Sequence, residues 1–477
     1  MTELTDLPAT EQAALIRSGQ LSARELLAAS LARIEGTNPA VNAIVTLDVE
    51  AAEAAAAAAD RAFMAREPLG PLHGLTLAVK DLHATAGMRT THGSPAFADH
   101  VPDEDELIVE RMRAAGAVIV GKTNVPEFGA GSHTFNRVFG VTRNPYALDR
   151  SAGGSSGGAA AAVAAGMVSL ADGSDMGGSL RNPASFCNVV GHRPSPGRVP
   201  TVPNRDPWLT LAVQGPMGRT VADTALLLSV QAGPDARSPI ALAEEGSTFA
   251  ASLPTRLDGL RIAVSPDLGG AVVVDPEVAA AVEAQVEVLR SLGATVERTS
   301  LDFTGAEEAF RTIRALSFLQ GLGELVDTSP ELVKQTIHQN VAAGRALTGD
   351  DIARAMRLRA ALHDRTYHFF QEYDALVLPT SQALPFDADL EYPTEVAGVA
   401  MPDYLGWMQA ACMVTATECP ATAVPVAFSR DGLPIGVQVV AGPRNDLGAL
   451  GVGHALERAT LASSRRPSVT TAAVGVA

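Results

Sequence analysis

Apolar residues recur at helical spacing in the first part of the chain. Ser22 and Glu25 form an S-x-x-E capping box ahead of apolar residues that share one helix face, namely Leu27, Leu31 and Ile34. The Ala-rich run 51–59 favours a helix by propensity alone. We therefore predict that residues 1–65 form an N-terminal helical segment that packs on the core.

Short apolar runs bounded by turn residues begin at about residue 70. The runs Leu75–Val79 and Ala117–Val120 are typical of buried strands, and Glu106–Ala115 between them has a helical pattern that ends at Gly116. A strand, a helix and a strand at this spacing indicate a βαβ unit.

The same alternation continues toward the C-terminus. A strand is predicted at Arg261–Val264, followed by a helix that Asp275 caps and that ends at Gly293. Further strands are predicted at Ala375–Leu378, Thr422–Phe428 and Gly436–Ala441, with a last helix at Asp446–Leu461. We predict an α/β fold, a single large α/β/α domain over residues 66–470, whose mixed, mostly parallel central sheet is covered by helices. Residues at about 300–370 form a helix-rich insertion.

Composition narrows the function classes. Of 477 residues, 47% are hydrophobic and 19% charged, which is typical of a globular chain, and the net charge is −17. That charge argues against a nucleic-acid partner, which needs a basic surface, and against an anionic membrane. No apolar run reaches spanning length. Three sparse cysteines and a start without a signal-peptide pattern favour a cytoplasmic protein.

A lysine ends the first predicted strand, in the run Leu77-Ala78-Val79-Lys80-Asp81. A lone lysine at this place is more often exposed and solvated. If it is buried, its pKa falls and a neutral amine becomes available as a base. Strand alternation places the Asp81 side chain on the opposite face, away from that amine.

Two glycine-rich segments carry serines. Gly153-Gly154-Ser155-Ser156-Gly157-Gly158 precedes an Ala-rich helix, so it predicts a tight turn into that helix rather than a phosphate loop. In Asp175-Met176-Gly177-Gly178-Ser179-Leu180-Arg181, glycines before a serine allow consecutive N–H groups to turn toward one point and hold an oxyanion. Each segment alone is equally compatible with a plain glycine turn.

Together, and in this order, the three segments closely resemble the amidase signature family. The strongest match lies in residues 149–200, with DRSAGGSSGGAAAAVAAG, DGSDMGGSLRNPASFCNVVG and HRPSPGRVP. The runs PLHGLTLAVKDLHATAGMRTTHGS, GAVIVGKTNVPEFG, GPMGRTVADTALLL and DGLPIGVQVVAGP also resemble that family. The resemblance covers most of residues 10–462.

The resemblance implies a role for each matched residue. Ser179 is the expected nucleophile, Ser155 the relay serine after a cis peptide bond, and Lys80 the base. The N–H groups of Met176, Gly177, Gly178 and Ser179 are the expected oxyanion hole. An acyl-enzyme intermediate is implied, and no metal or organic cofactor is needed. None of the ten histidines lies in a zinc-type motif.

Residues near the three candidate catalytic residues are predicted to support the site or to pack in the core. Arg181 is predicted to order the loop by pairing with Asp175, and Ser156 to support Ser155. Cys187 is interpreted as a packed small residue, and His133 as a scattered surface histidine rather than a pocket residue. The chain departs from the family pattern at Met176, Asn188 and His192-Arg193, so specificity does not carry over.

Three functions remain open. The favoured one is a stand-alone hydrolase of amides, anilides or carbamates, as a monomer or homodimer. The second resembles the ammonia-generating A-type component of glutamyl-tRNA amidotransferase, but residues 209–214, LTLAVQ, differ from that component's usual Ser-Leu-Asp-containing run. The third, a catalytically dead binding protein, is disfavoured because Lys80, Ser155 and Ser179 are all present.

A bulky or aromatic substrate is the expectation for the pocket. Apolar and aromatic residues in the less family-like regions are its candidate lining, with ordinary core packing as the competing interpretation: Phe128, Phe135, Trp208, Phe318, Tyr404, Trp407 and Met408. If they line the pocket, aryl acylamidases and urethane-cleaving members of the family are the nearest analogues.

Overall fold

A large mixed sheet forms the centre of the protein. The computed structural model describes residues 3–467 and 469. The 11-stranded sheet contains, in pairing order, β1 (Ile44–Leu47), β3 (Val118–Thr123), β2 (Thr76–Lys80), β8 (Leu170–Asp175), β10 (Val213–Gly218), β9 (Val190–Arg193), β16 (Ala421–Phe428), β17 (Pro434–Ala441), β13 (Ala375–Pro379), β11 (Arg261–Val264) and β12 (Thr295–Arg298).

Parallel pairing occupies two separate parts of this sheet. Strands β3, β2 and β8 pair in parallel, as do β13, β11 and β12. The pairs from β8 through β17 to β13, and the edge pair of β1 with β3, are antiparallel. The mixed α/β fold is confirmed, but the parallel pairing that was predicted for most of the sheet holds only in these two parts.

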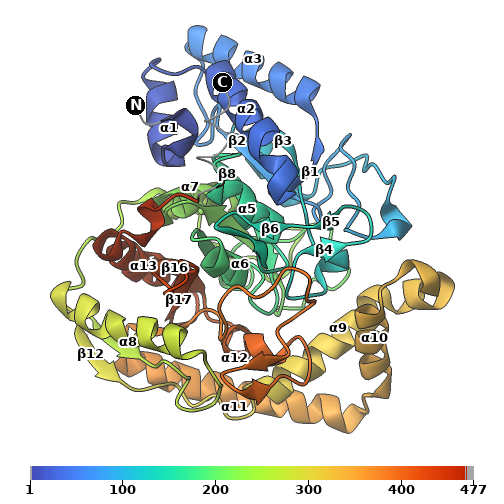
Figure 1. Cartoon of the computed structure of the whole chain (residues 1–477), viewed down its shortest axis with the longest axis vertical. Helices are drawn as coiled ribbons and strands as arrows, with labels where there is room; N and C mark the ends of the chain where they lie inside the picture. The colour runs from blue at the N-terminus through green and yellow to red at the C-terminus, as the bar shows by residue number, and fades with distance from the viewer. Residues whose placement is uncertain (1–2, 468, 470–477) are drawn as a thin grey trace.

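Helices cover both faces (Figure 1). They are α1 (Ala9–Arg17), α2 (Ala23–Val41), α3 (Val49–Met64), α4 (Leu107–Ala114), α5 (Gly157–Ala164), α6 (Arg181–Phe186), α7 (Val221–Gln231), α8 (Pro276–Ser291), α9 (Ala306–Thr328), α10 (Gln335–Ala346), α11 (Gly349–Glu372), α12 (Gln409–Ala416) and α13 (Asp446–Thr460). Three short hairpins lie outside the sheet: β4 (Phe135–Asn136) with β5 (Gly140–Val141), β6 (Arg143–Asn144) with β7 (Ala147–Ser151), and β14 (Glu395–Val396) with β15 (Val399–Ala400).

The alternation along β2 shows how the layers are built. Leu77 and Val79 belong to the core cluster that contains apolar residues of α4, α7, α8 and α13. Ala78 belongs to the cluster on the other face, which contains the buried alanines of α5. Because strand side chains alternate, Lys80 shares the face of Ala78. The chain therefore aims the Lys80 side chain toward the α5 layer.

The N-terminal segment differs from its prediction in one respect. The capping box at Ser22 and Glu25 is present at the start of α2. However, residues 44–47 form β1, an edge strand that pairs with β3, so the segment also extends the sheet. Four residues between two long helices carry little strand signal, and pairing with β3 decides their conformation. The predicted domain end at residue 470 lies outside the described residues.

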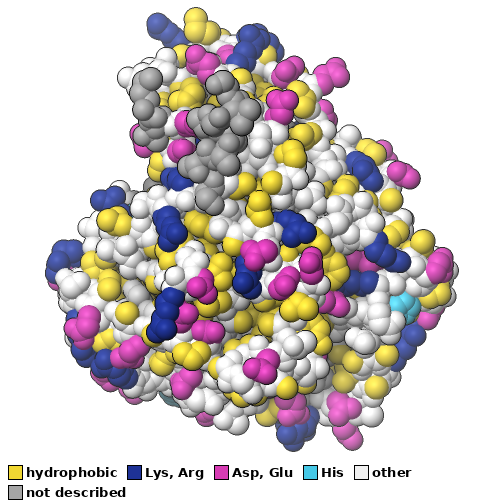
Figure 2. Space-filling view, in the orientation of Figure 1, with side chains coloured by type: hydrophobic (Ala, Val, Ile, Leu, Met, Phe, Trp, Pro, Cys, Tyr) yellow, Lys and Arg dark blue, Asp and Glu magenta, His cyan; other side chains and the backbone are white. Residues whose placement is uncertain are grey.

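Helices α9, α10 and α11 form the helix-rich region predicted at about 300–370. In Figure 1, α9 and α10 lie to one side of the sheet, below the β4–β5 hairpin. Acidic and basic side chains are interspersed over the face shown in Figure 2. Among the described residues, no helix combines the length and apolar character that a membrane span requires.

Candidate active site

The amine of Lys80 lies among serine hydroxyls. Every residue of β2 is buried, and Lys80 itself is 0% exposed. Its Nζ is 2.8 Å from Ser155 Oγ, 2.7 Å from Ser156 Oγ and 3.1 Å from Ser174 Oγ. The three serines come from the turn before α5 and from β8. The lysine is thus buried, as its proposed role as a base requires.

Burial lowers the pKa of Lys80 to about 7, although the charges of Asp172 and Asp175 oppose that shift. Asp81 does not add to this opposition, because its carboxylate accepts from the N–H and hydroxyl of Thr91, on the other side of the strand. Near neutral pH a large fraction of the Lys80 amine is therefore neutral. A neutral amine is able to accept a proton.

Ser155 follows the cis peptide bond Gly154–Ser155. Close packing surrounds this bond, since a Cβ on Gly154 would lie 2.9 Å from the backbone nitrogen of His133. The N–H of Ser156 donates to the carbonyl of Ser179 over 3.2 Å. Ser155 and Ser179 line the same cavity. The structure thus brings the three predicted catalytic side chains into one region.

The turn after β8 presents backbone N–H groups. Those of Met176, Gly177 and Ser179 have no acceptor among the described residues, and all three residues line the cavity. The N–H of Gly178 instead donates to Asp175 Oδ1 over 2.9 Å. The prediction that Gly178 contributes to an oxyanion hole is therefore wrong for this structure, because its N–H group already has a carboxylate partner.

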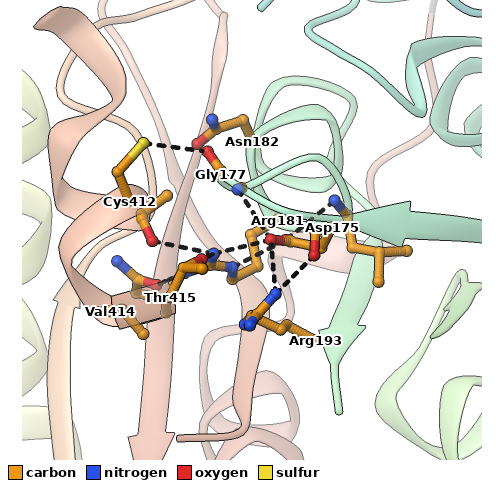
Figure 3. Close-up of polar contacts among 12 residues, drawn as sticks. Asp175, Gly177, Arg181, Asn182, Arg193, Cys412, Val414 and Thr415 are labelled. Carbon is orange, nitrogen blue, oxygen red and sulfur yellow. Dashed lines mark hydrogen bonds and ion pairs between the residues drawn. The ribbon is translucent and has the colours of Figure 1, made fainter. Parts of the chain in front are cut away.

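Asp175 is the centre of a buried ionic network (Figure 3). Its carboxylate accepts from Arg181 Nε and Nη2, each over 3.0 Å, and its main-chain carbonyl accepts from Arg193 Nη1 over 2.6 Å. Burial would raise the pKa of Asp175, but Arg181 and Arg193 outweigh it and hold that pKa well below its usual range. The predicted Asp175–Arg181 pair is present.

Arg181 also ties the turn to distant parts of the chain. Its Nη1 donates to Gln438 Oε1 on β17 over 2.7 Å. Its Nη2 donates to the carbonyl of Ala411 (3.0 Å) and to Thr415 Oγ1 (2.9 Å), both on α12. A buried, fully bonded arginine of this kind fixes the geometry of the turn.

A cavity of about 230 Å³ opens beside the serines, and we call it the site cavity. Of the predicted pocket residues, Phe128, Phe318, Tyr404 and Met408 line it. The other residues that line it are Leu82, Gly129, Gly131, Ser155, Ser174, Asp175, Met176, Gly177, Ser179, Ala212, Arg314 and Leu405. Its wall is therefore largely apolar opposite the proposed nucleophile.

Three predicted pocket residues lie elsewhere. Trp208 is 70% exposed on a surface turn. Trp407 is fully buried, stacks on Phe186 and donates from Nε1 to Ser132 Oγ over 2.9 Å. Phe135 is half-buried and packs against the His133 ring. The prediction for these three residues was wrong because it rested on side-chain type alone, and aromatic residues occur in cores and surface turns as readily as in pockets.

The structure also places His133 and Cys187, which the sequence left outside the catalytic set. His133 is 1% exposed, and its ring contacts the Ala388 carbonyl (2.9 Å) and Ser151 Oγ (2.6 Å). It is therefore a bonded core residue and not a surface histidine. Cys187 is buried, and burial raises its thiol pKa well above the ordinary value, which suits a packed residue.

Sequence reasoning missed four residues of the site: Asp172, Ser174, Arg193 and Arg314. Asp172 and Ser174 lie in the DGSD run, two and four residues beyond Leu170, so strand alternation was an available signal. Arg193 stood out only as a departure from the family pattern. Arg314 had no signal, because it lies on α9 far from the glycine-rich segments.

No described group of three or more His, Cys, Asp or Glu side chains is arranged to hold a metal ion.

Sequence comparison identifies a family and its members. The sequence model of the Amidase family matches residues 25–450. An acylamidase from Rhodococcus erythropolis is 35% identical over 442 residues, which cover 92% of both chains. The A-type component of the glutamyl-tRNA(Gln) amidotransferase from Moorella thermoacetica is 35% identical over 491 residues, which cover 98% of this chain and 99% of that one.

Structural comparison gives the same picture. A bacterial aryl acylamidase of the amidase signature enzymes superposes with a TM-score of 0.90 at 30% identity, with all of both chains covered. The 6-aminohexanoate cyclic dimer hydrolase superposes with a TM-score of 0.88 at 29% identity, covering 98% of this chain and all of that one.

Proposed function

Because this chain belongs to the Amidase family of C–N hydrolases, we propose that Ser179, Ser155 and Lys80 carry out its reaction. The proposal rests on the burial, the pKa and the hydroxyl contacts of Lys80. A buried amine with a pKa near 7 lies 2.8 Å from Ser155 Oγ, beside the cavity that Ser179 also lines. A charged, solvated lysine would serve none of the steps that follow.

The proposed reaction begins with two proton transfers. Neutral Lys80 takes the proton of the Ser155 hydroxyl, and Ser155 takes the proton of Ser179. The Ser179 oxygen then forms a bond to the substrate carbonyl carbon. The protons return along the same path to the leaving nitrogen as the C–N bond breaks. Water then attacks the acyl-enzyme by the same relay and releases the acid.

The negative charge that develops on the carbonyl oxygen needs donors. Met176, Gly177 and Ser179 line the site cavity, and their backbone N–H groups donate to no acceptor among the described residues, so these N–H groups are the proposed oxyanion hole. One such donor contributes roughly 3–4 kcal/mol to a transition state. The Asp175–Arg181 pair supports this role by fixing the turn that carries them.

The proposed substrates are amides, anilides or carbamates with a bulky apolar group. Phe128, Phe318 and Met408 give the site cavity apolar walls. Two of the relatives are described as an acylamidase and an aryl acylamidase. A carbamate requires the same attack and the same oxyanion hole as an amide, so a urethanase activity is included in the proposal.

A second candidate function is that of an A-type amidotransferase component, which would supply ammonia to a partner protein. The 35% identity to the glutamyl-tRNA(Gln) amidotransferase component favours it. The purified chain alone should turn over a chromogenic anilide if the first candidate holds. Activity that requires an added partner would support the second.

The test is a substrate panel with a fatty amide, an aryl anilide, a small primary amide and an aryl carbamate. Ser179→Ala should abolish turnover of whichever substrates the wild-type protein cleaves. Ser229→Ala is the matched control, because among the described residues its hydroxyl bonds only to the Leu226 carbonyl, within α7. Undiminished turnover in Ser179→Ala would refute the proposed nucleophile.

A further inference from the structure

The site cavity has a cationic side chain that the hydrolytic reaction does not use. Arg314, on α9, lines the same cavity as Ser155 and Ser179 and is only 6% exposed. Its Nη1 donates to Asn340 Oδ1 over 2.5 Å, and its Nη2 donates to the Tyr404 hydroxyl. Both acceptors are neutral, so neither balances the guanidinium charge.

Neighbouring cations have carboxylate partners, whereas Arg314 has none. Arg311, on the same helix, pairs with Glu307 and Asp403. Lys334 faces the charges of Glu391 and Glu127, which oppose the lowering of its pKa by burial. Arg314 forms no ion pair within the part of the chain that the structure describes. A buried charge without a partner is strongly unfavourable, so an anion bound beside Arg314 would stabilise the guanidinium.

The guanidinium keeps hydrogen-bond donors available at its edge. Its carbon lies 4.2 Å from the centre of the Phe318 ring, within the range of a cation–π contact. Of its five N–H groups, two make the bonds to Asn340 and Tyr404. The other three have no acceptor among residues 3–467 and 469.

Tyr404 adds a donor of its own. Its oxygen accepts from Arg314 and, over 3.2 Å, from Asn340 Nδ2. The hydroxyl proton has no acceptor among the described side chains and carbonyls. Because Tyr404 lines the site cavity, this proton is available to a ligand bound there.

We infer that Arg314 and Tyr404 form a subsite for a carboxylate on the substrate. The inference rests on the proposed function, since it places the carboxylate on the amide, anilide or carbamate that Ser179 attacks. A carboxylate accepts from a guanidinium edge with two oxygens and also supplies the missing negative charge. A neutral carbonyl accepts hydrogen bonds but leaves the charge unbalanced, so the anion is the better match.

The kinetic test compares anionic substrates with neutral analogues of the same shape. Glutaric acid mono-4-nitroanilide is paired with the 4-nitroanilide of 5-oxohexanoic acid, in which a methyl ketone replaces the carboxylate. N-acetyl-4-aminobenzoate and N-acetyl-4-aminoacetophenone place the same change on the amine side. For at least one pair, wild-type kcat/KM should favour the anion by roughly 30-fold or more, the fold-change typical of a buried charged hydrogen-bonded pair.

Arg314→Gln should bring the ratio of kcat/KM for the anion to kcat/KM for its neutral partner close to one. Tyr404→Phe, which deletes only the hydroxyl, should reduce the preference severalfold and tests the subsite even if Arg314→Gln does not fold. Arg345→Gln is the control, because Arg345 pairs with Asp327 on the surface of the same helical region, and it should keep the preference. Equal turnover of both members of both pairs by the wild-type protein would overturn the inference.

A binding measurement separates this inference from the proposed function. In Ser179→Ala, calorimetry should detect tighter binding of glutaric acid mono-4-nitroanilide than of its ketone analogue, and Arg314→Gln added to that variant should remove the difference. If the wild-type protein cleaves nothing but the binding preference is present, the hydrolytic proposal fails and the subsite stands. If cleavage occurs without any preference, the reverse holds.

Discussion

Two adjacent strands each contain a buried lysine, and their surroundings differ. Lys80 on β2 and Lys122 on β3 are both 0% exposed, in parallel strands where Val79 pairs with Lys122. Burial lowers the pKa of Lys80 to about 7 and that of Lys122 to about 8, against the charges of nearby carboxylates. By burial and pKa alone, either residue would qualify as a base.

The partner atoms distinguish the two. Lys122 Nζ donates to the His83 carbonyl over 2.5 Å and to Thr85 Oγ1 over 2.8 Å. The Thr85 hydroxyl donates its own proton to the same His83 carbonyl over 3.2 Å, so the Lys122 amine faces acceptors only. Lys80 also contacts the Ser174 carbonyl, over 3.5 Å, but three serine hydroxyls, which both donate and accept, lie closer to its amine. Burial makes a lysine a candidate base, but only partners that can return a proton allow it to act as one.

The largest expected difference is in activity. Lys80→Met should lower kcat/KM for a 4-nitroanilide by about 10²–10⁴-fold, the contribution of a positioned general base. Lys122→Met removes an equally buried charge but no proton path, so its kcat/KM should stay within about tenfold of wild type. Initial rates of 4-nitroaniline release measure both. Equal losses in the two variants would break the distinction between the lysines.

The pH dependence of kcat/KM should also distinguish Lys80 from Lys122. Because the proposed base is the neutral amine, kcat/KM should rise with pH and level off above the Lys80 pKa of about 7. Below that point the rate should fall about tenfold per pH unit. Lys122→Met should keep the midpoint, since the Lys122 amine is not titrated in the reaction. A midpoint that moves with Lys122→Met would assign the titration to the wrong lysine.

Stability should respond to both lysines. Each folded-state pKa lies below the unfolded value of about 10.4, so the unfolded chain binds more protons above pH 7. The lysine contribution to the free energy of unfolding should therefore increase from about pH 7 to 10.4 for Lys80, and from about pH 8 for Lys122. Urea unfolding at several pH values should show a flatter curve in each Lys→Met variant than in wild type.

The smallest effect is expected at a partner of Lys122. Thr85→Val deletes one acceptor of its amine and keeps the shape of the side chain. The free energy of unfolding should drop by about 1–3 kcal/mol, because a buried donor loses its partner. Activity should not change, in contrast to Ser155→Ala, which removes the corresponding hydroxyl beside Lys80. Loss of activity in Thr85→Val would connect Lys122 to the reaction.

The sequence could not separate these two lysines by pattern. Both follow short apolar runs, LTLAVK and AVIVGK, and only the resemblance to a family selected Lys80. The longer strands and amphipathic helices were predictable because hydrophobic periodicity fixes them, as at Thr422–Phe428, which lies within β16. β8 was not, since LADGSD has weak strand propensity and is held by pairing with β2 and β10.

The glycine-rich segments predicted the centre of the site, but not its lining. Serines and glycines at fixed spacing describe only local turns, and the family resemblance then selected Ser155, Ser156 and Ser179 as candidates. The cavity wall is assembled from helices distant in sequence. Whether Phe318 or Trp407 faces the cavity depends on how α9 and the 3-10 turn Gly406–Met408 before α12 pack, and the local sequence pattern does not determine that packing.

The bonds of Arg181 to α12 and β17 also bear on when the protein becomes active during synthesis. Lys80, Ser155 and Ser179 leave the ribosome early, whereas Gln438, which Arg181 contacts across 257 positions of sequence, emerges among the last residues. Until then the turn at Asp175 lacks the anchors that hold its N–H groups in place. A growing chain therefore contains the proposed catalytic residues long before the turn that carries the proposed oxyanion hole is anchored, so an incomplete chain should be inactive.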